Sequence, residues 1–353
     1  MKSQSGVRRW SGLVVTVLLA AAVLVPADFA AADAGDAGEV VNFALEPGDT
    51  RVYGKAEIES LRQSDAADSQ LSDSQIEDAR SDLVQESLSD GVYVEPQSVD
   101  VIPLLGGDAS IALDQDQVVE AATIRMSDEG VLSVSARTTE RDPETATLAG
   151  PGMAATWDAN GNGSYKIKIY VDFSLDGRGS LLYASGFFSW KRYKLLNDGD
   201  SSKVFYRYER FGDFQPESIS FVEDAKVRRL RIQSFPYDSV EPALKDWERY
   251  SPGSDRPDDC SSYSASVSFK AISVSVPFNE RCGVYNMWRN VDKASSYWIQ
   301  YENGNGGTGN REVAYVLVWS QEPGSAGSMH DLQLIETLIG GCQQTDASRT
   351  CSW

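Results

Sequence analysis

Histidine, the side chain that most often moves protons in enzymes, occurs once in this sequence, at position 330. A catalytic triad would have to use His330, and Ser328 and Asp331 stand close to it. Triad members meet in space rather than in sequence, so this neighbourhood is not a signature. We predict that His330 lies in a loop before a short helix over residues 331–338. Metal sites built on two or more histidines are excluded.

Acidic residues are the remaining candidates for catalysis, because the chain has 52 Asp and Glu residues. Glycoside hydrolysis needs two carboxylates about 5–10 Å apart. The sequence does not select such a pair, and it contains no Gly-x-Ser-x-Gly nucleophile motif. We therefore favour a protein that is not an enzyme. A carboxylate-dependent, glycosidase-like hydrolase is the alternative.

A weak calcium-binding candidate consists of Asp158, Asn160 and Asn162, followed by Gly163. Oxygen side chains at alternate positions before a glycine resemble the first half of an EF-hand loop. The twelfth position of that loop should be Glu and is Ile169. A polar turn that leads into a strand is the other interpretation of these residues. Apart from this Ca²⁺ candidate, we expect no cofactor.

One basic cluster stands out in the acidic chain, and its members are Lys226, Arg228, Arg229 and Arg231. If Leu230 and Ile232 face the core of a strand, Arg229 and Arg231 face water. These two arginines are candidates to bind an anionic polymer such as a cell-wall polysaccharide. The other interpretation is that they pair with nearby acids.

Aromatic residues crowd the C-terminal half, and three are candidates for ligand binding: Trp288, Trp298 and Tyr301. Exposed Trp and Tyr rings can stack on sugars, whereas buried rings fill a core. Trp298 is out of phase with its strand neighbours, which favours exposure.

Serine alternates with apolar residues over 262–278, and the alternation slips by one residue near Lys270. Either a β-bulge absorbs the extra residue or the chain reverses there. Pore-forming proteins insert amphipathic hairpins of this kind, so a membrane-acting protein is a second alternative.

The four cysteines all lie late in the chain, at positions 260, 282, 342 and 351. A hairpin at Lys270 would place Cys260 beside Cys282, and we favour that bridge together with Cys342–Cys351. A continuous strand would hold the first two on the order of 60–70 Å apart, which forbids their bridge. In that case Cys260 would pair with Cys342 or Cys351.

The N-terminus has the order of a secretory signal peptide, with basic residues, a 13-residue aliphatic run over 13–25 and then small residues. Membrane anchors need about 20 apolar residues, so we expect cleavage near Ala34. The mature protein should be secreted and soluble, without a permanent membrane anchor. The even cysteine count suits an oxidising compartment.

The net charge of −20 argues against nucleic acid and anionic membranes as main partners. Phosphate recognition requires clustered Lys and Arg, which the chain holds at one place only. The charge does support solubility outside the cell.

The fold class that we predict is mainly β, an antiparallel β-sandwich or barrel-like C-terminal domain preceded by a smaller acidic α+β region. We divide the chain into a signal peptide at 1–34, an acidic and partly mobile segment at 35–91, a small β-rich region at 92–150 and a disulfide-stabilised β-sandwich at 156–353. A helix is expected at about 72–89, with Ser74 and Glu77 as its capping box. Another short helix is expected at 241–250.

These observations favour a secreted binding protein that recognises a cell-surface glycan or protein through exposed aromatics. The oligomeric state does not follow from the sequence.

Overall fold

The computed structural model describes these residues: 41–42, 45–63, 71–141, 155–173, 179–217, 225–236, 241–255, 263–270, 272–278, 284–289, 296–325, 327, 329–338, 342–345 and 348–351. The predicted signal peptide at 1–34, Cys260 and Cys282 lie outside them. No helix in the described part of the chain is long and apolar enough to cross a membrane.

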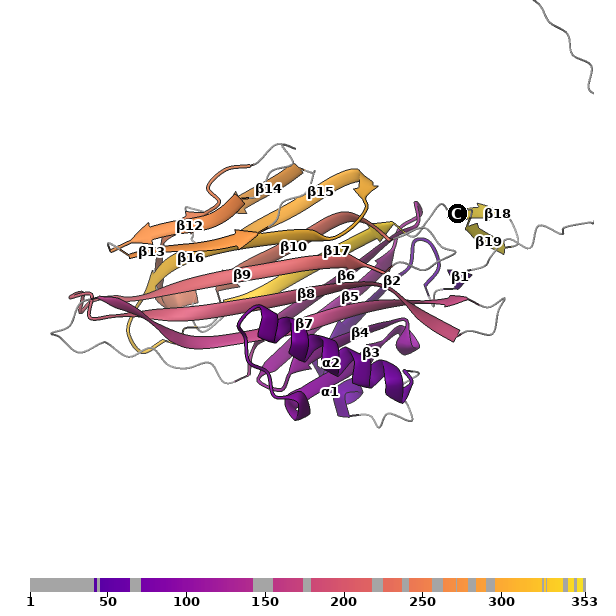
Figure 1. Cartoon of the computed structure of the whole chain (residues 1–353), viewed down its shortest axis with the longest axis horizontal. Coiled ribbons are helices and arrows are strands. Elements are labelled where there is room, and N and C mark those ends of the chain that lie inside the picture. Colours follow the sequence, from indigo (N-terminus) through magenta and orange to yellow (C-terminus); the bar gives the residue numbers. More distant parts are fainter. Residues whose placement is uncertain are drawn as a thin grey trace, which may run out of the picture. The chain divides into compact units, whose positions relative to one another are not determined.

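Two antiparallel sheets dominate the structure (Figure 1). Sheet A has the order β11-β16-β9-β8-β7-β4-β3, and β1 pairs with β7. Its strands are β1 (Val41–Asn42), β3 (Val99–Leu104), β4 (Ala109–Asp114), β7 (Thr156–Phe173), β8 (Gly179–Leu196), β9 (Val204–Pro216), β11 (Leu244–Ser251) and β16 (Arg311–Gln321).

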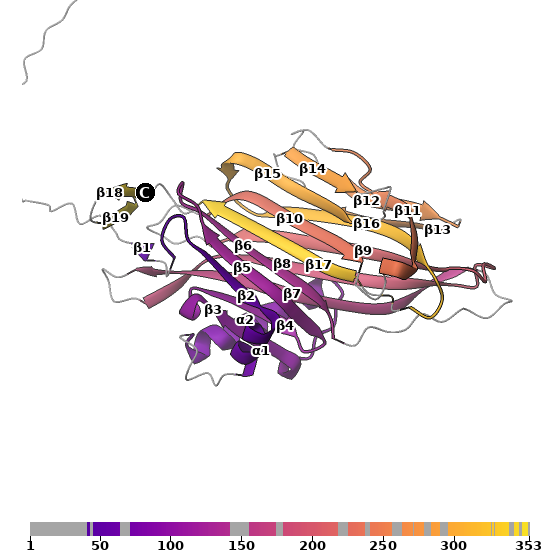
Figure 2. The same cartoon turned by 180° about the vertical axis from the view of Figure 1, so that it is seen from behind.

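Sheet B has the order β14-β15-β10-β17-β6-β5-β2, and Figure 2 shows β6, β17 and β10 side by side. Its strands are β2 (Thr50–Gly54), β5 (Gln117–Met126), β6 (Val131–Glu140), β10 (Lys226–Pro236), β14 (Val284–Arg289), β15 (Tyr297–Gly307) and β17 (Met329–Leu338).

The remaining elements are two hairpins, two α-helices and three 3₁₀ turns. They are β12 (Tyr263–Phe269) with β13 (Ile272–Phe278), β18 (Cys342–Thr345) with β19 (Ser348–Cys351), α1 (Lys55–Gln63), α2 (Asp73–Ser89), and the turns Pro96–Ser98, Leu105–Gly107 and Glu241–Ala243. Strands make up 65% of the structure and helices 15%, so the predicted mainly β, antiparallel fold class is confirmed.

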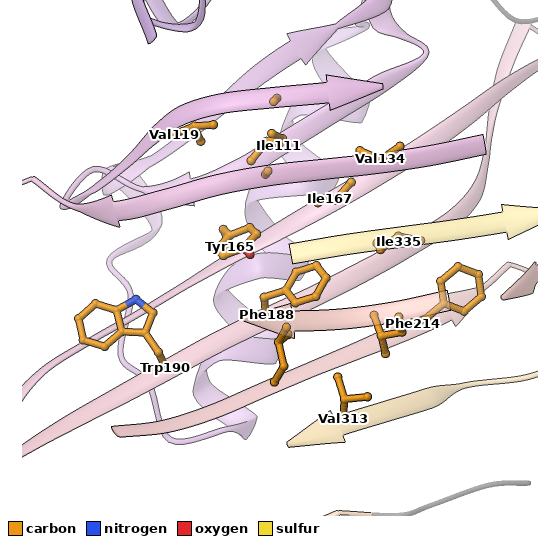
Figure 3. Close-up of a cluster of buried hydrophobic side chains, with 14 of the residues drawn as sticks. Ile111, Val119, Val134, Tyr165, Ile167, Phe188, Trp190, Phe214, Val313 and Ile335 are labelled. Atoms are coloured by element: carbon orange, nitrogen blue, oxygen red, sulfur yellow. The ribbon is translucent and has the colours of Figure 1, made fainter. Parts of the chain in front are cut away.

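The main core lies between the two sheets, because period-two strands turn one side chain in two toward the opposite sheet. Figure 3 shows Tyr165, Ile167 and Phe188 of sheet A together with Val134 and Ile335 of sheet B. Strand β16 is buried on both faces, as its continuous apolar run requires.

Contacts group residues 38–353 into one compact unit. Strands from the region 92–150 and from the region after 156 are paired in both sheets; β4 pairs with β7, and β6 pairs with β17. The two regions that the sequence analysis separated therefore contribute to common sheets.

The predicted helix at 72–89 is confirmed as α2, but its capping box is formed by a different pair. The Gln75 amide donates to Ser72 Oγ at 3.3 Å, and Gln75 Oε1 accepts from the Ser72 amide at 2.8 Å. The buried side chain of Leu71 fixes the chain just before Ser72, so the earlier of two equally spaced pairs becomes the cap. Helix α1 was not predicted.

The helices predicted at 241–250 and 331–338 are wrong. Residues 241–243 form a 3₁₀ turn that leads into strand β11, and residues 331–338 belong to strand β17. In β11, register shifts after Leu244 and Trp247 break the period-two pattern and leave a spacing that resembles a helix. In β17, the polar side chains of Asp331 and Gln333 face the core, which reverses the usual alternation. Sheet pairing overrides local propensity in both cases.

The chain reverses at Lys270, so the continuous bulged strand considered for 262–278 is wrong. Phe269 pairs with Ile272, and Lys270 has the positive φ of 49° that a two-residue hairpin turn needs. Residues that pair across such a turn have one odd and one even number, as Phe269 and Ile272 do. The slip in the alternation therefore keeps the apolar residues of both strands on the same face of the hairpin. The backbones of Cys342 and Cys351 are partners in the hairpin β18–β19; both disulfides stay predictions.

Candidate functional site

The outer face of sheet A is covered at two places. Helix α2 lies on one part, where its Glu86 accepts from Lys166 Nζ at 2.7 Å. Its Asp82 lies 2.6 Å from Lys168 Nζ. Both lysines are buried. The hairpin β12–β13 packs on β16 at another place. A ligand has little of this face to bind.

The outer face of sheet B is more open. Along β17, Leu332, Leu334 and Glu336 are half-buried, while the residues between them are buried. Arg229 and Arg231 of β10 belong to the same face and are also half-buried. The prediction that these two arginines point away from the core is therefore confirmed.

A cavity of about 370 Å³ lies on this face, at the end where β5 turns into β6. Eight of its nine lining residues are polar or charged; the lining consists of Arg125, Ser127, Asp128, Glu129, Val131, Ser133, Arg228, Arg229 and Glu336. The volume is in the usual range for small-molecule sites, and it contains one of the predicted ligand residues, Arg229.

The turn between β5 and β6 has a defined conformation. Ser127 Oγ accepts from the amides of Glu129 at 3.2 Å and Val131 at 3.0 Å. Gly130 closes the turn with a φ of 77°, which most other residues would adopt only with strain. Asp128 and Glu129 are thus held at the cavity by a serine-based turn.

A β-bulge explains why two consecutive arginines reach the cavity. The register of β10 shifts between Val227 and Arg229 against both of its neighbours. Arg228 is the extra residue, and it is half-buried like Arg229 instead of pointing into the core.

Charges of both signs alternate around the cavity. Arg229 lies 2.7 Å from Glu336 and 3.1 Å from Glu302, and Arg228 lies 3.2 Å from Glu129. Arg125 is exposed and has no ion pair with any residue that the structure describes. Its guanidinium therefore has donors available at the rim.

Such a lining suits hydroxyl groups better than it suits an ion. Three carboxylates would repel an anion, and three guanidiniums would repel a cation. A sugar hydroxyl both donates and accepts, so it can bond to Arg and Glu side chains at the same time.

Arg231 and Trp298 lie together on the same face, but neither lines the cavity. The Arg231 guanidinium is 4.3 Å from the centre of the Trp298 ring, so a cation–π contact occupies one ring face. Burial, together with the charge of Arg229, lowers the pKa of Arg231. The backbone of Trp288 pairs with that of Trp298; the Trp288 side chain lies outside the described part.

Tyr301 cannot serve as a platform for a ligand. Its side chain is fully buried in the core and contacts Tyr285 edge to face at 5.5 Å. The expectation of an exposed ring is wrong because Tyr301 belongs to the inward phase of β15, directly opposite Leu230 of β10.

The calcium candidate lies within β7 rather than in a loop. The backbone partners of Asp158 and Asn162 are Lys194 and Lys191. Asn160 Oδ1 accepts from Arg192 Nε at 3.0 Å, so a guanidinium already occupies one of the expected metal ligands. Among the described residues, no group of three or more His, Cys, Asp and Glu side chains could hold a metal ion.

His330 lies in β17 and not in a loop before a helix, which corrects the prediction. Its ring is buried and stacks on Phe235 at 5.1 Å, and Nδ1 is 2.8 Å from Glu120 Oε2. Asp331 points to the opposite face of the strand, so it cannot orient this imidazole. Ser328 lies outside the described residues.

Asp331 instead belongs to a buried polar network between the sheets. Its carboxylate accepts from Tyr208 at 2.5 Å and from Ser234 at 2.6 Å, and it lies 3.4 Å from Arg210 Nε. The Arg210 side chain has no exposed surface. When the side-chain amide of Gln333 is oriented with its oxygen toward Arg210, Arg210 Nη2 donates a hydrogen bond to that oxygen at 2.7 Å.

The charges in this network depend on each other. Burial raises the pKa of Asp331, and the charge of Arg210 opposes that rise. Burial lowers the pKa of Arg210, but Asp331 together with Tyr208, Tyr315 and Tyr165 raises it by more, so the pKa lies above its ordinary value. We interpret the network as structural, because both side chains are enclosed by the two sheets.

Seven residues of the cavity lining were missed by the sequence analysis: Arg125, Ser127, Asp128, Glu129, Val131, Ser133 and Glu336. One signal was present. The sequence Ser-Asp-Glu-Gly at 127–130 lies between two predicted strands and is typical of a tight polar turn.

Comparison with known proteins found no matching protein-family model, no matching curated protein and no matching solved structure.

Proposed function

We propose that this protein binds a neutral glycan outside the cell, with sugar hydroxyls seated in the cavity on sheet B. The observation that carries the proposal is the cavity's lining of paired guanidiniums and carboxylates on the open face of the sandwich. Residues 1–34, with the pattern of a signal peptide, support the extracellular location.

Three charged side chains have distinct roles in this proposal. Arg125 donates to the ligand from the rim, because no described residue uses its guanidinium. Glu336 accepts from a sugar hydroxyl through the oxygen that does not bond to Arg229. Arg231, supported by Trp298, extends the polar surface along β10 for a longer chain of sugars.

Binding explains the cavity better than hydrolysis. A glycosidase needs an acid whose pKa is raised, so that it can protonate the leaving group. Burial raises the pKa of Asp213 and of Asp331, but neither residue lines the cavity. The hydrolase remains the alternative, and turnover of a bound glycan would support it.

Arg125→Ala should weaken glycan binding about tenfold or more, since charge-assisted hydrogen bonds contribute about 1.5–3 kcal/mol. The stability should stay unchanged, because Arg125 has no ion pair within the described residues. A glycan array on the wild type would identify the ligand, and titration calorimetry would then give the affinities.

The matched control is Arg249→Ala, which removes an exposed arginine from the edge of sheet A. Equal losses of affinity in the two variants would contradict the assignment of the site, and so would a wild-type protein that binds no glycan. Glu336→Gln tests the acceptor side and should also weaken binding, while Glu302 still pairs with Arg229.

A further inference from the structure

The hairpin β12–β13 is a separate two-stranded sheet, whose strands pair with each other and not with sheet A or sheet B. It is therefore held to the sandwich by side-chain packing and a few polar contacts, not by a ladder of backbone hydrogen bonds. No residue of this hairpin lines the cavity on sheet B.

The two faces of the hairpin differ sharply. One face carries the apolar residues Ala265, Val267, Phe269, Ile272, Val274 and Val276. The other carries exposed serines that bond to each other across the strands, Ser266 to Ser275 at 2.9 Å and Ser268 to Ser273 at 2.7 Å.

Charge is nearly missing from this element. From residue 263 to residue 278 the only charged side chain is Lys270, at the turn, although 24% of the whole chain is charged. Proteins often protect exposed strand edges with charged side chains, especially lysine, and this hairpin has only the lysine at its turn.

The apolar face packs on sheet A unevenly. Ala265 and Val267 of β12 are buried against Val316 and Val318, whereas the apolar residues of β13, including Val274, are half-exposed. Part of the apolar surface is thus in contact with solvent even in the docked position.

The tip has its own contacts. The centre of the Phe269 ring is 5.1 Å from that of Phe205 and 6.3 Å from that of Trp157. Lys270 Nζ is 4.9 Å from the centre of the Phe205 ring. Lys270 also lies 3.8 Å from Asp198.

A second polar contact joins the hairpin to sheet A. The Ser266 amide donates to Ser251 Oγ at 2.8 Å. Apolar packing therefore provides most of the attachment, and a lipid phase could replace it.

We propose that β12–β13 is a membrane-surface anchor, which leaves sheet A and places its apolar face in the interface of a lipid bilayer. The serine face then meets water and headgroups. Burial of the β12 and β13 side chains in lipid offsets the loss of their contacts with Val316 and Val318.

The dimensions favour an interfacial position over a spanning one. Each strand has seven residues, and spanning strands need about 9–11. A single hairpin would also expose unpaired backbone groups at its edges to hydrocarbon, which costs several kcal/mol per group. The acidic body should favour zwitterionic over anionic lipid.

Val274→Lys should reduce binding to phosphatidylcholine vesicles at least about tenfold, because it places a charge on the apolar face. Ser275→Lys is the matched control, which adds the same charge to the next residue on the serine face. Its binding should stay within about twofold of the wild type. Co-sedimentation of the mature, full-length protein with sucrose-loaded vesicles measures both.

Thermal unfolding followed by circular dichroism shows whether Val274→Lys folds. If it does not, Val274→Thr takes its place, and exchanging one methyl for a hydroxyl should weaken binding about fourfold. A wild type that does not sediment with vesicles overturns the proposal, and so do equal losses in the valine and serine variants. Release of dye entrapped in the vesicles would indicate that the hairpin forms a pore, and this result would also overturn the proposed surface anchor.

Discussion

Replacing Asp331 with asparagine should lower the free energy of unfolding at pH 7 by about 3–5 kcal/mol, the usual cost of breaking a buried ion pair. Arg210 would keep its charge in a site without exposed side-chain surface and would lose its counter-ion. Tyr208 and Ser234 would also lose a strong acceptor. Urea unfolding followed by tryptophan fluorescence measures the change.

Asp246→Asn is the control for this experiment, because it makes the same chemical change at an exposed position of β11. It should alter the free energy by less than about 0.5 kcal/mol. The double variant Arg210→Met with Asp331→Asn should recover part of the loss, since it removes the unpaired charge. If the double variant is as unstable as the sum of both single variants, the two residues are not coupled.

The second large effect is a dependence of stability on pH that arises at Asp213. Its carboxylate accepts from the Phe187 amide at 2.9 Å and from Gln215 Nε2 at 2.7 Å. Burial, with a smaller contribution from the charge of Glu86, raises the pKa of Asp213 to about 7. The folded protein therefore holds a proton at pH 5 that the unfolded chain has already lost.

This sign means that the stability contributed by Asp213 falls as the pH rises from about 4 to about 7. Asp213→Asn removes the titrating carboxyl group and keeps the shape of the side chain. The asparagine oxygen can accept from the Phe187 amide, and the Gln215 side-chain amide can rotate so that its oxygen accepts from the asparagine nitrogen. As the pH rises from 5 to 8, the free energy of unfolding of the variant should increase by about 3 kcal/mol relative to that of the wild type.

Urea unfolding of both proteins at pH 5, 6, 7 and 8 measures the difference. Asp246→Asn should show no such change with pH relative to the wild type, as its side chain is exposed. A constant difference between Asp213→Asn and the wild type across this range would show that Asp213 does not titrate there.

The fold class could be predicted because the strands that dominate it carry regular period-two patterns, such as residues 164–173 of β7. The errors occur where bulges or polar core residues disturb the period. Residues 241–250 resemble a helix because β11 has two register shifts. Residues 331–338 resemble one because β17 turns Asp331 and Gln333 inward.

The hairpin shows the opposite case, in which an irregularity carries information. A slip of one residue in the alternation is what a two-residue turn requires, yet Lys270 is an unusual turn residue. Its contacts with Phe205 and Asp198 explain why lysine is accepted at a positive φ.

The cavity could be predicted only in part. The arginines of β10 stand out in an acidic sequence, and Arg229 lines the cavity. Apart from Arg228, its other residues come from β5, β6, the turn between them and β17. The adjacency of these strands to β10 depends on long-range pairing that no local pattern encodes. The network of Arg210 and Asp331 was missed for the same reason.

The position of β17 has a consequence for how the chain folds. This strand lies between β6 and β10, so the part of sheet B formed by β2, β5 and β6 is paired to the part formed by β10, β15 and β14 only through β17. A growing polypeptide cannot complete that sheet until residues 329–338 have been synthesised. Such distant pairings slow folding and leave strand edges unpaired in the meantime. We therefore expect slow refolding from denaturant, and a need for protection of β6 and β10 until the late segment arrives.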